Sequence, residues 1–130
     1  MHLYDGDSLD TLVRAALAED LGAGDVTSEA LIPRTSIGEA VVVAKAELVL
    51  AGLDAAERVF AILDPSVTFT RKLADGDRLS PGDVACLVRG PLRSLLIGER
   101  TALNFVQRLS GVAPLTRRAA DALACTRTRL

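Results

Sequence analysis

Residues 92–110, LRSLLIGERTALNFVQRLS, decide the fold, because their apolar side chains recur with the spacing of an amphipathic helix. At about 100° per residue, one broad face of this helix is apolar. The residues on that face are Leu92, Leu95, Leu96, Ala102, Leu103, Val106 and Leu109. A helix with such a stripe packs on a core, so we expect the rest of the chain to supply one.

Polar side chains on the same helix raise the question of a site. Glu99 falls in the middle of the apolar face, and Arg100, Asn104 and Gln107 form a polar strip along its edge. A carboxylate on a buried face is costly unless it is paired or hydrogen-bonded. A guanidinium at the rim suits a carboxylate or a phosphate. Spacing alone favours a structural Glu–Arg pair and leaves an anion site as the alternative.

The composition indicates a globular domain rather than a disordered chain or a nucleic-acid binder. The chain has 130 residues, of which 49% are hydrophobic and 25% charged, enough for one domain with its own core. A net charge of −2 argues against nucleic acid or an anionic membrane as the main partner. The aromatic residues are 3 Phe and 1 Tyr, which leaves little for base stacking.

The ends and the cysteines point to a cytoplasmic protein without a metal site. The first ten residues, MHLYDGDSLD, lack the pattern of a signal peptide, and no apolar run is long enough to span a membrane. We therefore expect Cys86 and Cys125 to be reduced thiols. Two cysteines and His2 do not have the spacing of metal ligands.

Periodicity and turn signals predict eight elements. We expect helices over residues 9–20, 53–63, 92–110 and 113–124, and strands over 37–46, 47–51, 67–73 and 84–89. Strands joined by short turns, with a helix between them, indicate an α+β fold: an antiparallel sheet of about four strands packed against helices. The run GDVTS, residues 24–28, is typical of a loop that caps a helix.

Two of these stretches resemble one known family. GERTALNFVQRLSGVAPLTRRAADA, residues 98–122, is similar to the ERxxLN signature of the quinolinate phosphoribosyltransferases, also called carboxylating nicotinate-nucleotide pyrophosphorylases. EDLGAGDVTS, residues 19–28, resembles the family's EDxGxGDxTS stretch, and the two matches lie in the expected order. The resemblance implies an N-terminal α+β substrate and dimerisation domain over residues 1–112. Residues 113–130 would then begin the connection to an α/β-barrel domain that these residues do not include.

The resemblance also implies an activity. The family comprises glycosyltransferases that convert quinolinate and phosphoribosyl pyrophosphate to nicotinate mononucleotide, pyrophosphate and CO2 in NAD biosynthesis, with Mg²⁺. It implies that Arg100 reaches from one subunit into the active site of its dimer partner and binds a quinolinate carboxylate. Glu99, Asn104 and Gln107 are then supporting or structural residues, and no catalytic residue and no metal ligand lies in the chain. Because CTRTRL at the end does not match the DTRKT motif of the barrel, we expect the isolated chain to be inactive.

Other interpretations stay open at this point. A related pyrophosphorylase-like family associated with molybdenum transport shares the architecture, and a non-catalytic dimerisation module would need no barrel. The run KLADGDRLSPGDVACLV, residues 72–88, is similar to hairpins of biotinyl and lipoyl carrier domains, which carry a modifiable lysine at an exposed turn. Lys45 has no turn signal around it, which counts against a carrier.

Overall fold

A computed structural model describes residues 6–23, 35–111 and 114–120. In chain order the elements are α1 (Gly6–Ala23), β1 (Ile37–Ala44), β2 (Leu48–Val49), α3 (Leu53–Leu63), β3 (Thr68–Arg71), β4 (Arg78–Leu79), β5 (Val84–Pro91), α4 (Leu92–Leu109) and β6 (Leu115–Ala120). The predicted α+β class is therefore confirmed.

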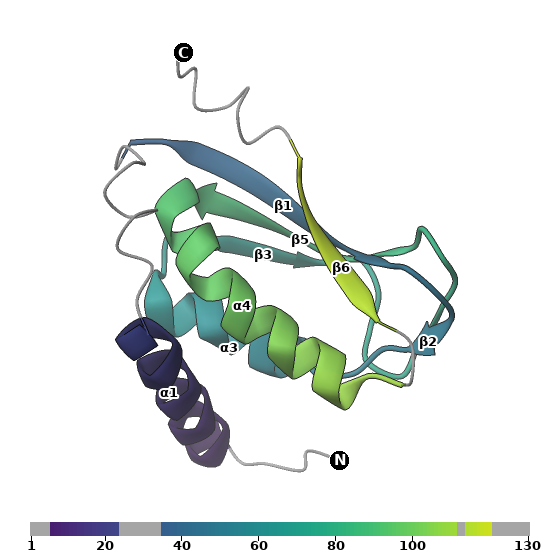
Figure 1. Cartoon of the computed structure of the whole chain (residues 1–130), viewed down its shortest axis with the longest axis horizontal. Coiled ribbons are helices and arrows are strands. Elements are labelled where there is room, and N and C mark those ends of the chain that lie inside the picture. Colours follow the sequence, from purple (N-terminus) through teal and green to yellow (C-terminus); the bar gives the residue numbers. More distant parts are fainter. Residues whose placement is uncertain (1–5, 24–34, 112–113, 121–130) are drawn as a thin grey trace.

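Four of the strands form one antiparallel sheet in the order β3-β5-β1-β6 (Figure 1). β1 is one of the two inner strands, each eight residues long, and it pairs with β5 on one side and β6 on the other. Every second residue of β1 is buried, so one face of the strand is covered. The short strands β2 and β4 pair separately as a two-stranded ribbon.

The covered face of the sheet carries α3 and α4, and α1 packs against both of these helices (Figure 1). The core between these layers is almost entirely aliphatic. Its fully buried residues include Val13 of α1, Leu53 and Val59 of α3, Leu79 of β4, and Leu95 and Val106 of α4. The helix predicted to organise the chain does so, since α4 contacts both other helices and three strands of the sheet.

α3 and α4 approach each other closely at Gly98. A Cβ atom at this position would lie 2.7 Å from Cε1 of Phe60, whose side chain is itself buried. At the other end of the contact, Gly52 precedes α3 with φ 92, and a Cβ there would meet the carbonyl oxygen of Phe105 at 3.0 Å. Glycine is thus required at both ends of this interface, at Gly52 for conformation as well as for space.

Several predicted boundaries agree with the structure. The helix predicted over 53–63 has those bounds, and the one predicted over 92–110 is one residue shorter. The strand expected to reach residue 46 ends at Ala44, so Lys45 is exposed in a bend rather than inside a strand. The strand expected over 47–51 belongs to the β2–β4 ribbon, not to the main sheet.

The helix predicted over 113–124 is wrong. Residues Leu115–Ala120, LTRRAA, form strand β6, which pairs antiparallel with β1 from Ala44↔Leu115 to Glu39↔Ala120. Local composition favoured a helix, but without β6 this side of β1 would be an edge with unpaired N–H and C=O groups. Tertiary pairing therefore overrides the local preference. His2, Cys125 and the GDVTS loop lie outside the described residues, and the division of the chain at residue 112 stays a prediction.

We predict that Gly98→Val destabilises the fold by about 2 kcal/mol, because its methyl groups would overpack against Phe60. Urea unfolding followed by circular dichroism measures the change. The control is Ala61→Val at an exposed position of α3, where only the lower helix propensity of valine acts, about 0.6 kcal/mol. Equal losses for the two variants would contradict the close approach of the helices.

Candidate functional site

Arg100 projects from α4 on the side away from the core. Leu95, Ala102 and Val106 on the opposite side of the helix are buried, whereas Arg100 is exposed. Among the described residues, Arg100 makes no ion pair and no hydrogen bond.

The three other predicted residues of α4 do not gather around Arg100. Glu99 is half-buried on the sheet side, where it lines a small apolar cavity together with Cys86 and Leu103. Gln107 donates its side-chain N–H to the carbonyl of Leu115 at 2.7 Å, which ties α4 to β6. Asn104 follows Arg100 by one helical turn and lines the groove between the helices. Of the three, Gln107 is exposed like Arg100, Asn104 is half-buried at the edge of the groove, and Glu99 faces the sheet.

Two polar contacts hold α1 against the other helices. Arg58 of α3 donates two hydrogen bonds to the Asp10 carboxylate, at 2.8 and 2.9 Å. The hydroxyl of Thr101 on α4 donates to the Asp20 carboxylate near the other end of α1. Val13 and Leu17 are buried along the helix between these two contacts. α1 is thus fixed at both ends, and Asp20 is brought next to the residue that follows Arg100.

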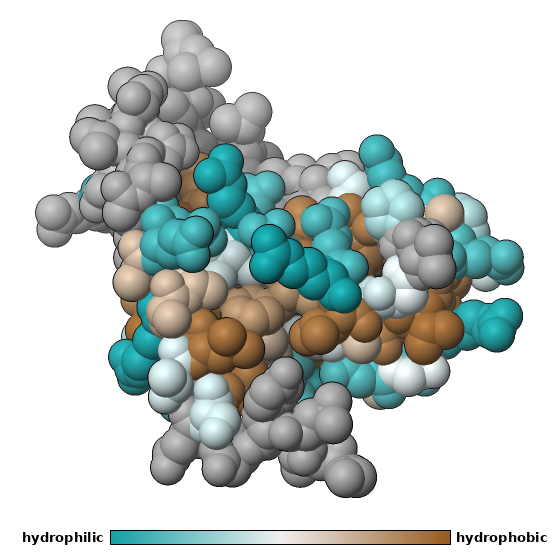
Figure 2. Space-filling view, turned by 60° about the horizontal axis from the view of Figure 1, so that its bottom comes forward, coloured by the Kyte–Doolittle hydropathy of each residue, from teal (hydrophilic) through white to brown (hydrophobic). Residues whose placement is uncertain are grey.

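An open groove of about 1110 Å³ runs between α1 and α4, with α3 as its floor. Its apolar lining includes Leu12 and Leu109, which are 44% and 50% exposed. Figure 2 shows apolar side chains in the middle of this side of the molecule, with hydrophilic ones around them. The sequence analysis did not predict the groove, because it depends on the angle at which α1 packs.

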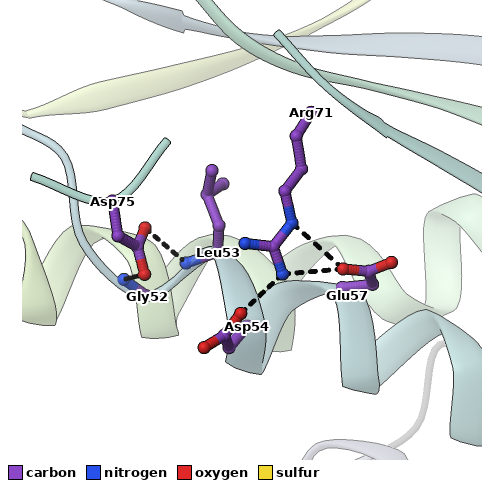
Figure 3. Close-up of polar contacts among 6 residues, drawn as sticks. All are labelled: Gly52, Leu53, Asp54, Glu57, Arg71 and Asp75. Atoms are coloured by element: carbon purple, nitrogen blue, oxygen red, sulfur yellow. Dashed lines mark hydrogen bonds and ion pairs between the residues drawn. The ribbon is translucent and has the colours of Figure 1, made fainter. Parts of the chain in front are cut away.

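Charged side chains at the start of α3 are satisfied within the fold (Figure 3). The Asp75 carboxylate accepts hydrogen bonds from the backbone N–H groups of Gly52 and Leu53, so it caps the helix from a distant loop. Arg71 donates to Asp54 and Glu57 at 2.6 and 2.7 Å. Burial lowers the pKa of Arg71, but its hydrogen bonds to the two carboxylates outweigh this effect and the pKa is raised. This cluster is structural rather than a ligand site.

Two further groups have shifted pKa values. Hydrogen bonds from the side chains of Ser94 and Ser66 lower the pKa of Asp64 at the end of α3. Burial raises the pKa of the Cys86 thiol to about 12, although the charge of Arg71 acts in the opposite direction. A thiol with that pKa carries almost no thiolate at neutral pH, so Cys86 is not a nucleophile.

The described residues contain no cluster of three or more His, Cys, Asp or Glu that fits a metal ion. Within the described part of the chain, no helix is long and apolar enough to cross a membrane. The chemistry offered by the described site is therefore anion binding through a guanidinium held on a rigid helix.

A comparison with protein families decides where the chain belongs. The model of the family "Quinolinate phosphoribosyl transferase, N-terminal domain" matches residues 25–110, which include both Arg100 and the run 72–88 that suggested a carrier module. The chain belongs to this family. The resemblance seen in the sequence is thus confirmed.

Relatives of the family domain are similar in sequence and in structure. The chain is 43% identical over 112 residues to "Quinolinate phosphoribosyltransferase [decarboxylating] 1" of Nicotiana glauca. It is 41% identical over 115 residues to a "Probable nicotinate-nucleotide pyrophosphorylase [carboxylating]" of Bacillus subtilis. These matches cover 85% and 88% of the chain.

Among solved structures, NadC from Streptococcus pyogenes superposes with a TM-score of 0.79 at 39% identity, over 85% of this chain. The nicotinate-nucleotide pyrophosphorylase from Francisella tularensis superposes with a TM-score of 0.74 at 33% identity, over 80% of this chain. In each case the family domain spans only part of the other protein. The chain covers 32% and 39% of the two sequence relatives and 40% and 37% of the two solved chains.

We predict that Ser94→Ala raises the pKa of Asp64 toward its ordinary value, because the carboxylate loses the 2.5 Å hydrogen bond from the serine hydroxyl. NMR titration of the Asp64 carboxyl measures this directly. A lowered pKa in the folded state stabilises the fold above the pKa of the unfolded chain, and this contribution is lost as the pH falls through the folded pKa.

The variant should therefore lose about 1 kcal/mol of stability at pH 7 and less at pH 3. Ser80→Ala, at an exposed serine in a turn, is the matched control. A loss that does not depend on pH would contradict the assigned contact.

Proposed function

We propose that the complete product of the gene encoding this chain is a quinolinate phosphoribosyltransferase. It would join quinolinate to phosphoribosyl pyrophosphate and release pyrophosphate and CO2, which yields nicotinate mononucleotide for NAD biosynthesis. The observation that carries the proposal is the family match over residues 25–110, supported by relatives that bear the names of these enzymes.

Within that reaction, we assign Arg100 to a carboxylate of quinolinate. Two features support the assignment: the guanidinium is exposed and unpaired among the described residues, and the helix beneath it is anchored in the core. A planar guanidinium forms bidentate hydrogen bonds with a carboxylate. Because Arg100 points away from its own core, we propose that it serves the active site of a partner subunit in a homodimer.

The remaining requirements of the reaction are not met by the described residues. Phosphoribosyl transfer needs several cationic groups around two carboxylates and a pyrophosphate. The described residues do not fit Mg²⁺ either, since they contain no cluster of three possible ligands. We therefore propose that Mg²⁺ and the substrates bind mainly to residues that correspond to the uncovered part of the relatives. Cytoplasmic location, which the sequence led us to expect, also remains a proposal.

Replacing Arg100 with alanine in the complete gene product should raise the KM for quinolinate about 10- to 100-fold, because a charge-assisted hydrogen bond to the substrate is lost. The stability of the protein should not change, since Arg100 is exposed. Steady-state kinetics with varied quinolinate measure the effect. Arg108→Ala is the matched control, because Arg108 is also exposed, lies on α4 and has no ion pair among the described residues. An unchanged KM for quinolinate would refute the assignment.

The 130-residue chain by itself should not turn over quinolinate, because we place most of the cationic groups that bind the substrates in the part of the relatives that the chain does not cover. Incubation with both substrates and Mg²⁺, followed by chromatography for nicotinate mononucleotide, tests this. Product formation at a rate comparable to that of the complete gene product would show that the site is contained in these residues.

A further inference from the structure

The exposed large hydrophobic side chains of the described residues gather on one side of the molecule. They are Leu12 on α1, Val49 on β2 and Leu109 at the end of α4. Leu12 and Leu109 line the groove between the helices, and the carbonyl of Val49 accepts a hydrogen bond from the N–H of Gly111, just beyond Leu109. Figure 2 faces this side and shows apolar side chains across its middle. Single exposed hydrophobic residues are common on protein surfaces, whereas several in one place indicate a surface that contacts another molecule.

Most of the charged side chains that line the groove already bind partners within the fold. They are Asp20, Asp54, Glu57, Arg58, Arg71 and Asp75. Two more charged residues line the groove, Glu19 on α1 and Arg108 on α4, and both are exposed. Among the described residues, neither of these two makes an ion pair or a side-chain hydrogen bond. The groove therefore offers one anion and one cation beside its apolar side chains.

The course of the chain favours one of two ways to cover this surface. The relatives continue well beyond the part that the chain matches, since it spans 32% of one sequence relative and 40% of one solved chain. After α4 ends beside the groove, β6 runs along β1 from Leu115, opposite Ala44, to Ala120, opposite Glu39. β6 ends at the top of Figure 1, whereas α1 lies at the bottom. A segment that continues from β6 would have to pass around the domain to reach the groove, but a second molecule reaches it directly.

We propose that the groove is an interface between two copies of the protein, each of which presents this same surface to the other. In this two-fold arrangement, Leu12 and Leu109 of each copy cover the apolar side chains of the other, and Glu19 of each copy forms an ion pair with Arg108 of the other. One charge of each sign makes the surface complementary to itself, whereas a purely acidic or purely basic partner would match only one of them. Arg100 does not line the groove, so the contact is separate from the quinolinate site and does not depend on the proposed function.

Sedimentation velocity of the 130-residue chain over a wide range of concentration measures the association of two copies. Leu12→Asp should raise the dissociation constant at least about tenfold, because a carboxylate would be buried without a partner. The matched control is Ala18→Asp, at a residue of α1 that is exposed but does not line the groove. A monomeric unsubstituted chain, or equal effects of the two substitutions, would overturn the proposal.

A charge exchange tests the predicted ion pair without touching the apolar contact. Glu19→Arg and Arg108→Glu each place like charges opposite each other, so each should weaken association about two- to fivefold, the range for an exposed ion pair. Both side chains are exposed, so the fold should tolerate the changes. Combining the two substitutions places opposite charges together again and restores the original dissociation constant. A double variant that associates no better than the single variants contradicts a contact between identical surfaces.

The complete gene product distinguishes this interface from coverage of the groove by the rest of the same chain. Light scattering should show that Leu12→Asp yields a species of lower mass than the unsubstituted protein, while Ala18→Asp keeps the original mass. If Leu12→Asp leaves the mass unchanged and lowers the stability instead, the groove is covered within one molecule and the proposal is wrong.

Discussion

The close packing of α4 on α3 is the constraint on which the rest of the structure depends. Gly98 lets the ring of Phe60 approach the backbone of α4, and Gly52 lets the start of α3 approach the last turns of α4. Because protein interiors are packed as densely as crystals, a helix pair that meets through glycine has little freedom to rotate. The rotation of α4 decides which of its side chains face the core and which face solvent.

That rotation separates two roles within a single helix. Leu95, Ala102 and Val106 are buried, while Arg100 stands on the other side. The charge therefore costs little in desolvation, and it stands on an element that is too well packed to move. A guanidinium on a flexible loop would lose more conformational entropy on binding a small dianion. A rigid helix thus suits the role proposed for Arg100.

The polar contacts of the described residues follow a common pattern. Each of the pairs Arg58–Asp10, Ser94–Asp64 and Thr101–Asp20 joins two elements that are distant in sequence, and Asp75 joins a loop to the start of α3. In each case a carboxylate accepts the hydrogen bonds. These four carboxylates therefore bind groups within the fold, and among the described residues none of them forms an ion pair with Arg100.

The sequence by itself determined the α+β class, the apolar face of α4, the helix over residues 53–63 and the family, because these depend on local periodicity and on short motifs. It also indicated Arg100 as the candidate ligand residue. Tertiary structure decided what local patterns do not encode. Residues 115–120, which local composition predicted to be helical, form a strand that pairs with the edge of β1. Pairing the exposed N–H and C=O groups of that edge stabilises the fold more than a weak local preference for helix would.

The tertiary structure also decided the contact between Asp20 and Thr101 and the groove beside it, since both depend on the angle between α1 and α4. A side chain's role in such a contact is set by neighbours that are far away in the sequence, and only the packed core brings those neighbours together.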